Sequence, residues 1–353
     1  MIQAHTLDAW TRGPARTGRA FDYTAMLGGF AAPLFLWLAG VGVAMSAGRL
    51  SRRGERPAAI VEAVTRRGLE IFVLAFLFRL QAFVVSPGSY AVTLFRVDIL
   101  NIMGPAMVAS GIVWGLAGRG AGRARLVVPY AGLAFACAMI TPIVRTAAAI
   151  DSLPTWLQWY MRPAGDYTTF TLFPWTGFVL AGAACGVLLE NARDDLSERH
   201  VLIWFAVAGA ALIGLGFATA ARPSIYAQAS FWTSSPTYFA IRIGSLMIGL
   251  AGLAALSGVL DGHGVQWRPL ERLGRSSLFI YWIHVELVYG YATWPLRHRL
   301  PLWGSLIAFT VFSVLMYRAV LARDRLVDAW QARQRYREAV LGVSAPGGPP
   351  GNR

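Results

Sequence analysis

Long apolar runs separated by short polar segments dominate the chain. A helix needs about 20 predominantly apolar residues to cross the hydrocarbon core of a bilayer, and such runs recur from end to end. We therefore predict an all-α, polytopic transmembrane helix bundle with about nine spans. The predicted spans are residues 26–47, 69–83, 95–116, 126–143, 173–189, 201–221, 238–260, 276–294 and 303–320.

The two ends of the chain differ from this pattern. Residues 1–10 are too short for a span and resemble the last turns of a helix, so a tenth span is expected upstream of Met1. Residues 323–338 are basic with spaced Leu326, Trp330 and Tyr336, which is typical of a helix on a membrane surface. Residues 345–351 are rich in proline and glycine and are predicted to be disordered. We therefore divide the chain into a membrane domain, 1–322, and a cytoplasmic tail, 323–353.

Composition and charge support the membrane class. The chain is 56% hydrophobic and only 14% charged, whereas a soluble domain is roughly 25% charged. The net charge is +14 and every basic residue is an arginine. The arginines lie in short loops between apolar runs, as in the basic cytoplasmic loops of membrane proteins, which argues against nucleic-acid binding. This rule places loops 49–67, 119–125, 190–200 and 261–275, and the C-terminus, in the cytoplasm. The uncharged turn 86–89 then falls outside, and loop 296–300 is an exception.

Several kinds of chemistry leave no signature. Cys137 and Cys185 lie inside apolar segments without metal-ligand neighbours and are read as small hydrophobic residues. Residues 118–122 lack the Lys-Ser/Thr of a phosphate-binding loop, and no nucleophile elbow is visible. We predict no metal site and no permanently bound cofactor. Cofactor-free chemistry on a histidine, or transport, remains.

The strongest candidate site is His284, in the middle of an apolar run. An ionisable side chain at membrane depth is costly and usually faces a bundle interior or a water-filled cavity. At helical spacing it shares a face with Ser277 and Tyr281, while Glu286 points elsewhere. The alternative is a structural histidine bonded to a neighbouring helix, with Glu286 pairing an arginine from another helix.

Three further polar groups are candidates. His5 and Asp8 share a helix face, and a carboxylate holding an imidazole is what a general base needs; the alternative is a polar helix end in the headgroup region. Asp22 either caps a helix or has a function. In the group formed by Arg96, Asp98 and Asn101, the arginine either binds an anion or pairs with Asp98.

Two glycine patterns predict close helix packing. Gly111 and Gly115, and likewise Gly182 and Gly186, have the small-xxx-small spacing that lets membrane helices approach each other.

Four segments, in this order, resemble one known family. Residues 32–44 (APLFLWLAGVGVA) are similar to its "P-x-F-x-F-x-x-G-x-x-x-A" span, and residues 95–104 to the segment that enters its central span. Residues 173–177 (FPWTG), with Gly182 and Gly186, resemble its "F-P-x-x-G" helix. Residues 273–284 (LGRSSLFIYWIH) resemble its "L-G-x-x-S-L-x-x-Y-x-x-H" helix. Together they resemble the bacterial branch of the heparan-alpha-glucosaminide N-acetyltransferase family, a group of transmembrane acyltransferases.

The resemblance implies transfer of an acetyl or acyl group from coenzyme A, loaded from the cytoplasm, to a sugar-like acceptor on the far side. His284 matches the late family histidine, and His5 matches a histidine that ends the first span in related bacterial sequences. Residues 15–22 contain no histidine. A covalent acyl-histidine would therefore have to form on His5, or transfer is direct.

Our hypothesis assigns roles accordingly. His5, oriented by Asp8, deprotonates the acceptor, and His284 positions the acyl group or the oxyanion. Arginines at the cytoplasmic mouth hold the coenzyme phosphates by charge and bidentate bonding. The complete set of substrate or coenzyme contacts that we predict is Asp22, Arg66, Arg67, Arg96, Asp98, Asn101, Arg275, Ser277, Tyr281 and Glu286.

Two rival functions remain open. One is a transporter or flippase in which His284 and Glu286 line a substrate path. The other is a membrane-embedded interaction protein. For the acyltransferase we expect a multi-pass protein of the cell membrane. Its partners would be acyl-CoA, a sugar or glycan-like acceptor, membrane lipid and, in a homo-oligomer, further copies of the chain.

Overall fold

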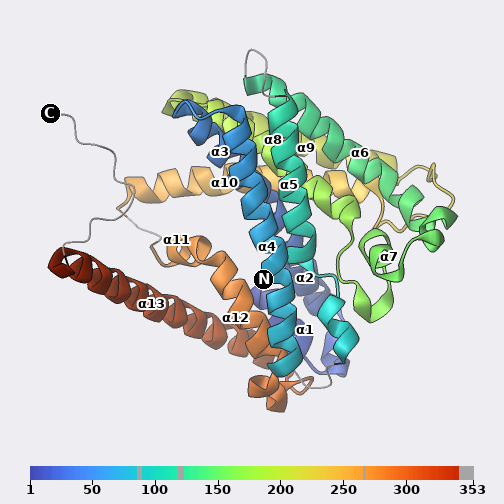
Figure 1. The fold of residues 1–353 in the computed structure, drawn as a ribbon. Helices are drawn as coiled ribbons and strands as arrows, with labels where there is room; N and C mark the ends of the chain where they lie inside the picture. The colour runs from blue at the N-terminus through green and yellow to red at the C-terminus, as the bar shows by residue number, and fades with distance from the viewer. Residues whose placement is uncertain (86–89, 118–122, 265–267, 342–353) are drawn as a thin grey trace. The chain divides into compact units, whose positions relative to one another are not determined.

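The computed structural model describes residues 1–85, 90–117, 123–264 and 268–341 (Figure 1). Within these ranges the regular elements are helices, joined by two isolated β-bridges, so the prediction of an all-α protein is confirmed. The predicted turn 86–89, the loop 118–122 and the predicted disordered segment 345–351 lie outside the described residues. The α-helices are α1 (Ile2–Trp10), α2 (Arg19–Gly28), α3 (Ala31–Arg52), α4 (Pro57–Val85), α5 (Ile99–Ala117), α6 (Val127–Thr146), α7 (Thr155–Met161), α8 (Leu172–Asn191), α9 (Asp195–Ala220), α10 (Pro236–Gly262), α11 (Arg268–Arg275), α12 (Ser277–Tyr289) and α13 (Leu302–Leu341).

Eight stretches of helix in the described chain are long and apolar enough to cross a membrane. They are α2 with α3, then α4, α5, α6, α8, α9, α10 and α13. Eight of the nine predicted spans coincide with them. The remaining predicted span, residues 276–294, contains α12, an apolar helix of 13 residues. This is a multi-pass membrane protein.

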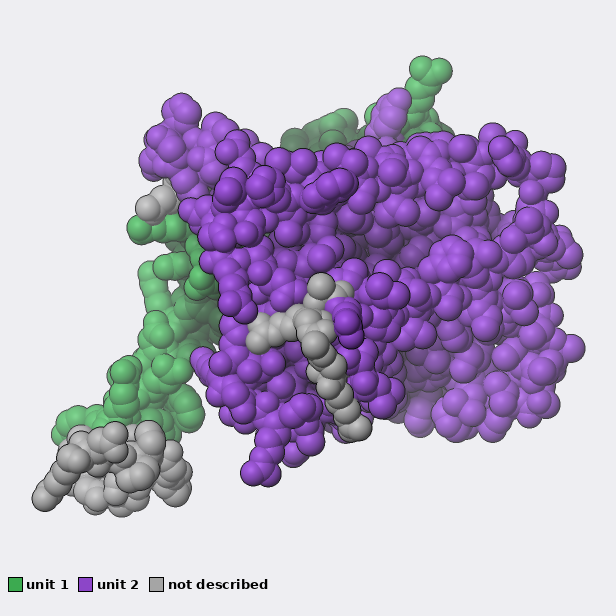
Figure 2. All heavy atoms as spheres, turned by 90° about the horizontal axis from the view of Figure 1, so that it is seen from above, with its two compact units in different colours: residues 1–22, 267–353 green, residues 23–266 purple. Residues whose placement is uncertain are grey.

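The described chain forms two compact units, which Figure 2 shows in different colours. Unit 1 consists of residues 1–22 and 267–353, and unit 2 of residues 23–266. Unit 1 therefore joins the two ends of the sequence.

Unit 2 is built from helix pairs that pack closely: α3 with α8, α4 with α5, and α9 with α10. Gly186 shows why the first pair can approach. A Cβ atom at this position would lie 2.7 Å from the backbone oxygen of Val41. At Gly111 on α5, a Cβ would meet Val64 of α4 at 3.0 Å. Both glycine patterns thus lie at helix–helix contacts, as expected.

Unit 1 has a small core where α1, α12 and α13 meet. Trp10, Val288, Phe312 and Met316 are buried there together, and the indole of Trp10 donates a hydrogen bond to the Val288 carbonyl at 3.4 Å.

The backbone secures the same junction. Residues 9–12 exchange three hydrogen bonds of 2.9 Å with residues 298–300, including the bridge between Thr11 and Leu300. The start of the chain is thereby fixed against the segment that follows α12. The long helix α13 contains the last predicted span and continues without a break through the basic residues 323–338.

Candidate active site

His5 and His284 meet inside unit 1. His5 lies on α1 and His284 on α12, and their ring centroids are 5.2 Å apart with the planes tilted by 52°. His284 is completely buried, and His5 is half-buried. The backbone pairing of residues 9–12 with 298–300 holds α1 against α12 and so brings together two residues from opposite ends of the sequence.

The hydrogen bonds of His284 fix the form of its ring. Nδ1 lies 2.6 Å from the carbonyl oxygen of Ile280. A carbonyl can only accept, so we assign the ring proton to Nδ1. In the neutral imidazole, Nε2 then carries the lone pair. Nε2 is buried and has no hydrogen-bond partner among the described residues. A buried polar atom of this kind needs an explanation, and chemically this nitrogen can accept a proton or act as a nucleophile.

His5 is connected to Asp8 through Tyr289, which is not among the predicted site residues. Tyr289, the last residue of α12, donates its hydroxyl proton to Oδ2 of Asp8 at 2.8 Å. The same hydroxyl oxygen lies 3.1 Å from Nδ1 of His5. The phenol has one proton and gives it to the carboxylate, so we assign the proton between the two rings to Nδ1 of His5. In the neutral imidazole, Nε2 again carries the lone pair.

Asp8 is held in turn by Arg16. A guanidinium nitrogen lies 3.7 Å from Oδ1 of Asp8, and the guanidinium also donates to the backbone carbonyls of Asp8 and Thr11. Its Nη2 donates to Nδ1 of His298 at 3.0 Å. His298 adopts a left-handed backbone conformation, with φ of 55°, and its N–H is bound by the carbonyl of Ala9. Non-glycine residues rarely adopt this conformation, and they occur often at functional sites.

The other candidates of unit 1 surround this group or lie at helix ends. The ring of Tyr281 lies 6.0 Å from that of His284, and Glu286 is buried on the same helix. Ser277 begins α12 and is half-buried. Arg275 is exposed and pairs with Glu271 at 2.5 Å. Asp22 is exposed in the first turn of α2.

The remaining candidates belong to unit 2. Arg66 and Arg67 are exposed on α4, and both pair with Glu70 of the same helix. Asp98 is almost fully buried and forms ion pairs with Arg96, at 3.8 Å, and with Arg79. Asn101 accepts the backbone N–H of Asp98 at 3.0 Å. Thus Arg96 and Asp98 pair with each other, and Asn101 fixes the entry to α5.

Three residues of the site were missed: Tyr289, Arg16 and His298. Tyr289 is five residues beyond His284, which places it on another side of α12 by helical spacing. Arg16 ends a short 3-10 helix, Gly13–Arg16, and His298 lies in a turn, and neither segment has a periodic pattern. A tyrosine that ends the helix of His284 was the one local signal available. No group of three or more His, Cys, Asp or Glu side chains in the described chain has the arrangement of a metal site.

The described arrangement can accept a proton on either imidazole. Two imidazoles lie side by side, each with its lone pair on Nε2, and one of them leads through a phenol to a carboxylate. A carboxylate at the end of such a chain fixes the tautomer and stabilises the imidazolium that forms when Nε2 takes up a proton.

Comparison with known proteins assigns the chain to a family. No curated protein matches its sequence. A family model described as heparan-alpha-glucosaminide N-acetyltransferase, catalytic, matches residues 1–219, which is more than half of the 353 residues. His5, Asp8 and Arg16 lie within the matched part, and His284 and Tyr289 lie beyond it. The chain belongs to the heparan-alpha-glucosaminide N-acetyltransferase catalytic family.

Proposed function

We propose that this protein is an integral membrane acyltransferase that moves an acetyl or acyl group from acyl-CoA to a sugar-like acceptor across the membrane. The observation that carries the proposal is the contact between His5 and His284, with His5 linked through Tyr289 to Asp8. Membership of the family supports it independently.

The reaction can be written through His5. Its Nε2 accepts the proton of the acceptor's N–H or O–H group while the acceptor atom bonds to the thioester carbonyl carbon. The carbon–sulfur bond then breaks, and the imidazolium returns the proton to the thiolate, which leaves as the free thiol of coenzyme A. Tyr289 and Asp8 stabilise the imidazolium during this step. Nδ1–H donates to the Tyr289 hydroxyl, and the bond from that hydroxyl to the Asp8 carboxylate makes its oxygen a stronger acceptor.

The tautomer of His284 supports a second role, while its role in positioning the acyl group stays a prediction. A donor to an oxyanion needs a proton on the nitrogen that faces it, and the bond to Ile280 places the proton of the neutral ring on Nδ1. Its Nε2 is therefore an acceptor. We propose that His284 either shares the proton with His5 or attacks the thioester carbonyl carbon through Nε2. In the second case the Nε2–carbon bond forms, the carbon–sulfur bond breaks and coenzyme A leaves as its thiolate. The acceptor then attacks the acyl carbon, the Nε2–carbon bond breaks, and the acceptor's proton passes through His5 to the thiolate.

We also propose that exposed arginines hold the coenzyme phosphates. Arg66, Arg67 and Arg275 pair with Glu70 or Glu271 on their own helices. Exposed pairs of this kind contribute roughly 0–1 kcal/mol, so a phosphate can replace the carboxylate at small cost. Arginine favours such oxyanions because its planar donors bind two oxygens at once. We place the protein in the cell membrane, with these arginines and the C-terminus in the cytoplasm.

The test is full-length protein in proteoliposomes supplied with radiolabelled acetyl-CoA and an amino-sugar acceptor. We expect His5→Ala and His284→Ala each to reduce label transfer by at least about 100-fold. His200→Ala, at an exposed histidine on α9, is the matched control and should transfer label like the wild type.

Binding of acetyl-CoA, measured by equilibrium dialysis on the same samples, separates the alternatives. A catalytic role predicts that both variants still bind the coenzyme. If both variants transfer label as well as the wild type, the assignment of the histidines is wrong. If the wild type neither binds nor transfers, a transporter for another solute becomes the better hypothesis.

A further inference from the structure

A second group of charged residues lies in unit 2, where α4 and α6 end and α5 and α8 begin. Arg79 is in the last two turns of α4, and Arg96 precedes α5. Arg145 is in the last turn of α6. Antiparallel spans alternate in direction, so the ends of α4 and α6 and the starts of α5 and α8 lie on one side of the membrane. Figure 1 shows α4 beside α5, and α8 packs against both α5 and α6.

One short segment before α8 connects these arginines. Arg96 donates to the hydroxyl of Thr169 at 2.8 Å and 3.2 Å, and that hydroxyl donates to Oδ1 of Asp98 at 3.2 Å. Arg145 donates to the hydroxyl of Thr171 at 3.4 Å. Thr169 and Thr171 are two residues apart, so their Cα atoms lie at most about 7 Å from each other. Arg96 and Arg145 therefore both contact the segment 169–171, and Arg79 is linked to it through Asp98.

The group has too few carboxylates for its arginines. Arg79, Arg96 and Arg145 bring three positive charges, and Asp98 brings one negative charge. The nearby Asp151 is engaged by Arg162, and Asp166 lies exposed in the turn before Thr168.

The hydrogen bonds of these arginines also show that positively charged donors outnumber their acceptors. The Nε atoms of Arg79 and Arg145 are buried, and neither has a hydrogen-bond partner in the described part of the chain. Burying a guanidinium group whose N–H groups lack acceptors costs free energy unless an anion binds to it. A single polyvalent oxyanion would supply both charge and acceptors.

We propose that Arg79, Arg96 and Arg145 form a binding site for an oxyanion, either a small soluble one such as sulfate or phosphate, or the phosphate of a lipid headgroup. Arg96 is the point of entry because 37% of its side chain is exposed, whereas the Arg79 side chain is only 13% exposed. Guanidinium groups bind such ligands in bidentate geometry. This site does not depend on acyl transfer and belongs to unit 2 alone.

The test is the thermal unfolding midpoint of the purified full-length protein in neutral detergent. Sodium sulfate is compared with sodium chloride at the same ionic strength. We expect sulfate at about ten times its Kd to raise the wild-type midpoint by about 3 °C. Arg145→Gln and Arg96→Gln should each lose this increment, whatever their midpoint in chloride.

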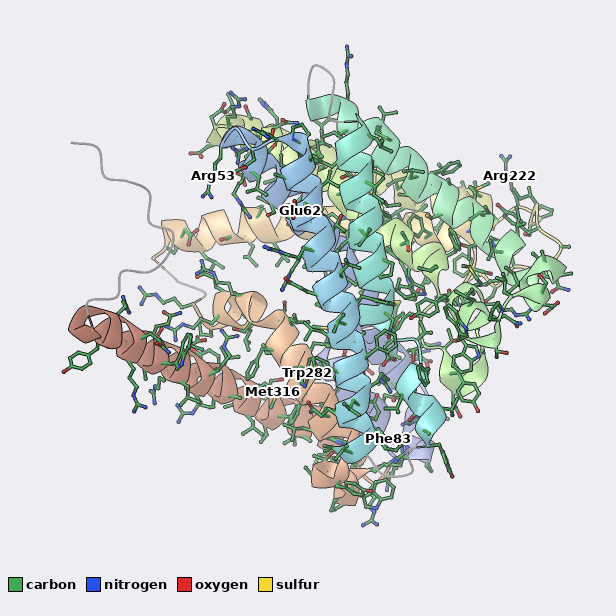
Figure 3. The ribbon with its side chains drawn as sticks, in the orientation of Figure 1. Arg53, Glu62, Phe83, Arg222, Trp282 and Met316 are labelled. Carbon is green, nitrogen blue, oxygen red and sulfur yellow. The ribbon has the colours of Figure 1, made fainter. Side chains whose placement is uncertain are left out.

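Arg222→Gln is the matched control. This exposed arginine follows α9, is labelled in Figure 3, and loses the same charge on substitution. It should keep the full increment. An increment that is present in the wild type and equally large in Arg145→Gln would overturn the proposal. The absence of any wild-type increment, both with sulfate in detergent and with anionic lipid, would also overturn it. In that case Arg145 serves only to stabilise the C-terminal end of α6.

A lipid arm identifies the source of the anion. Nanodiscs of phosphatidylcholine are compared with nanodiscs that also contain phosphatidylglycerol. A stabilisation by the anionic lipid that Arg145→Gln abolishes, without an effect of sulfate in detergent, assigns the site to a headgroup. The opposite pattern assigns it to a soluble anion.

Discussion

At the scale of single residues, the active-site group depends on which atoms carry protons. Tyr289 connects an imidazole nitrogen and a carboxylate that come from the other end of the chain. Its hydroxyl accepts from His5 and donates to Asp8, so a single oxygen atom forms both bonds. The aromatic ring of Tyr289, by contrast, packs against the hydrophobic core of unit 1. A mutation can therefore test the contribution of the hydroxyl separately from that of the ring.

Tyr289→Phe removes the hydroxyl and keeps the ring. We expect kcat to fall by about 100-fold, because Asp8 can no longer stabilise the imidazolium of His5, while KM for acyl-CoA stays within about twofold. Steady-state kinetics in proteoliposomes measures both constants. Tyr291→Phe, at an exposed tyrosine in the next segment, is the control and should behave like the wild type. An unchanged kcat in Tyr289→Phe would exclude the relay.

Arg16 is a positioning residue, since its bonds reach Asp8, Thr11 and His298. If it acts through the carboxylate, Arg16→Gln and Asp8→Asn must be non-additive. The double variant should then lose no more activity than Asp8→Asn alone. A double-mutant cycle in log kcat measures this, with Arg12→Gln at a neighbouring exposed arginine as the control. Fully additive losses would show that Arg16 supports the fold and not the relay.

At the scale of helices, hydrophobicity predicts the membrane core and little beyond it. The second span was predicted from residue 69, but α4 begins at Pro57. The additional turns carry Glu62, labelled in Figure 3, and Arg66, which pairs with Glu70. Such pairs at helical spacing stabilise a helix in water, yet they interrupt the apolar run on which the prediction depends.

The candidate site was predictable only in part, because helical patterning reveals only residues within a helix. His284 could be found because it is an ionisable residue within an apolar helix, and Asp8 because it shares a face with His5. The contact between the two histidines depends on backbone pairing between residues 9–12 and 298–300. That pairing brings together distant segments and leaves no periodic pattern, so Arg16 and His298 could not be found. For Tyr289 the one local signal was its place at the end of the helix that carries His284.

The packing of α8 on α3 gives a prediction for stability. At Gly186 a Cβ would lie 2.7 Å from the Val41 oxygen and 2.9 Å from the Ala44 Cβ. Gly186→Ala should therefore lower stability by about 1–3 kcal/mol, seen as a lower midpoint of thermal unfolding in detergent. Gly249→Ala on α10 has open space around the new methyl group and gains the same helix propensity. Its midpoint should stay the same or rise, and equal midpoints for the two variants would contradict the packing argument.

The start of α9 gives a prediction for pH. The backbone N–H and the hydroxyl of Ser197 bind Asp194 at 2.7 Å and 2.9 Å, and these bonds lower the pKa of Asp194 below its usual 3.8. A carboxyl group whose pKa is lowered by folding stabilises the folded state at pH values above its pKa in the unfolded chain. This stabilisation is lost as the pH falls through the pKa of the group in the folded state. Protection of the first α9 amides should therefore drop below pH 3.8. Hydrogen exchange, corrected for intrinsic rates, measures it, and Asp194→Asn should remove the drop.

At the scale of the whole molecule, the number of crossings fixes which loops share a side of the membrane. Between Arg53 and Arg222 lie five spans, α4, α5, α6, α8 and α9. An odd number places the two arginines on opposite sides. The loop at Arg53 is richer in arginine than the loop at Arg222 and is expected in the cytoplasm. One span separates Arg53 from Arg79 and Arg96, and three spans separate it from Arg145, so the oxyanion site is expected on the same side as Arg222.

The side of the C-terminus depends on α12. Its 13 residues rise about 20 Å, less than the roughly 30 Å of the hydrocarbon core. If residues 276–300 cross together, three crossings separate Arg222 from Tyr336, and the arginine-rich half of α13 is cytoplasmic. If residues 276–300 enter the membrane and return to the same side, two crossings separate Arg222 from Tyr336, and the arginine-rich half of α13 lies outside. The charge rule favours the first arrangement, because Arg323, Arg325, Arg333 and Arg335 would otherwise lie on the wrong side.

Cysteine labelling distinguishes the two arrangements. Tyr336→Cys, Arg53→Cys and Arg222→Cys replace exposed residues, and a membrane-impermeant maleimide is applied to intact cells and to inside-out vesicles. We expect residues 336 and 53 to react only in inside-out vesicles and residue 222 only in cells. The parent chain, with Cys137 and Cys185 inside apolar helices, reports background labelling. Reaction of residue 336 in intact cells would mean that α12 does not cross, and the coenzyme would then have to reach His284 by a route other than the C-terminal side.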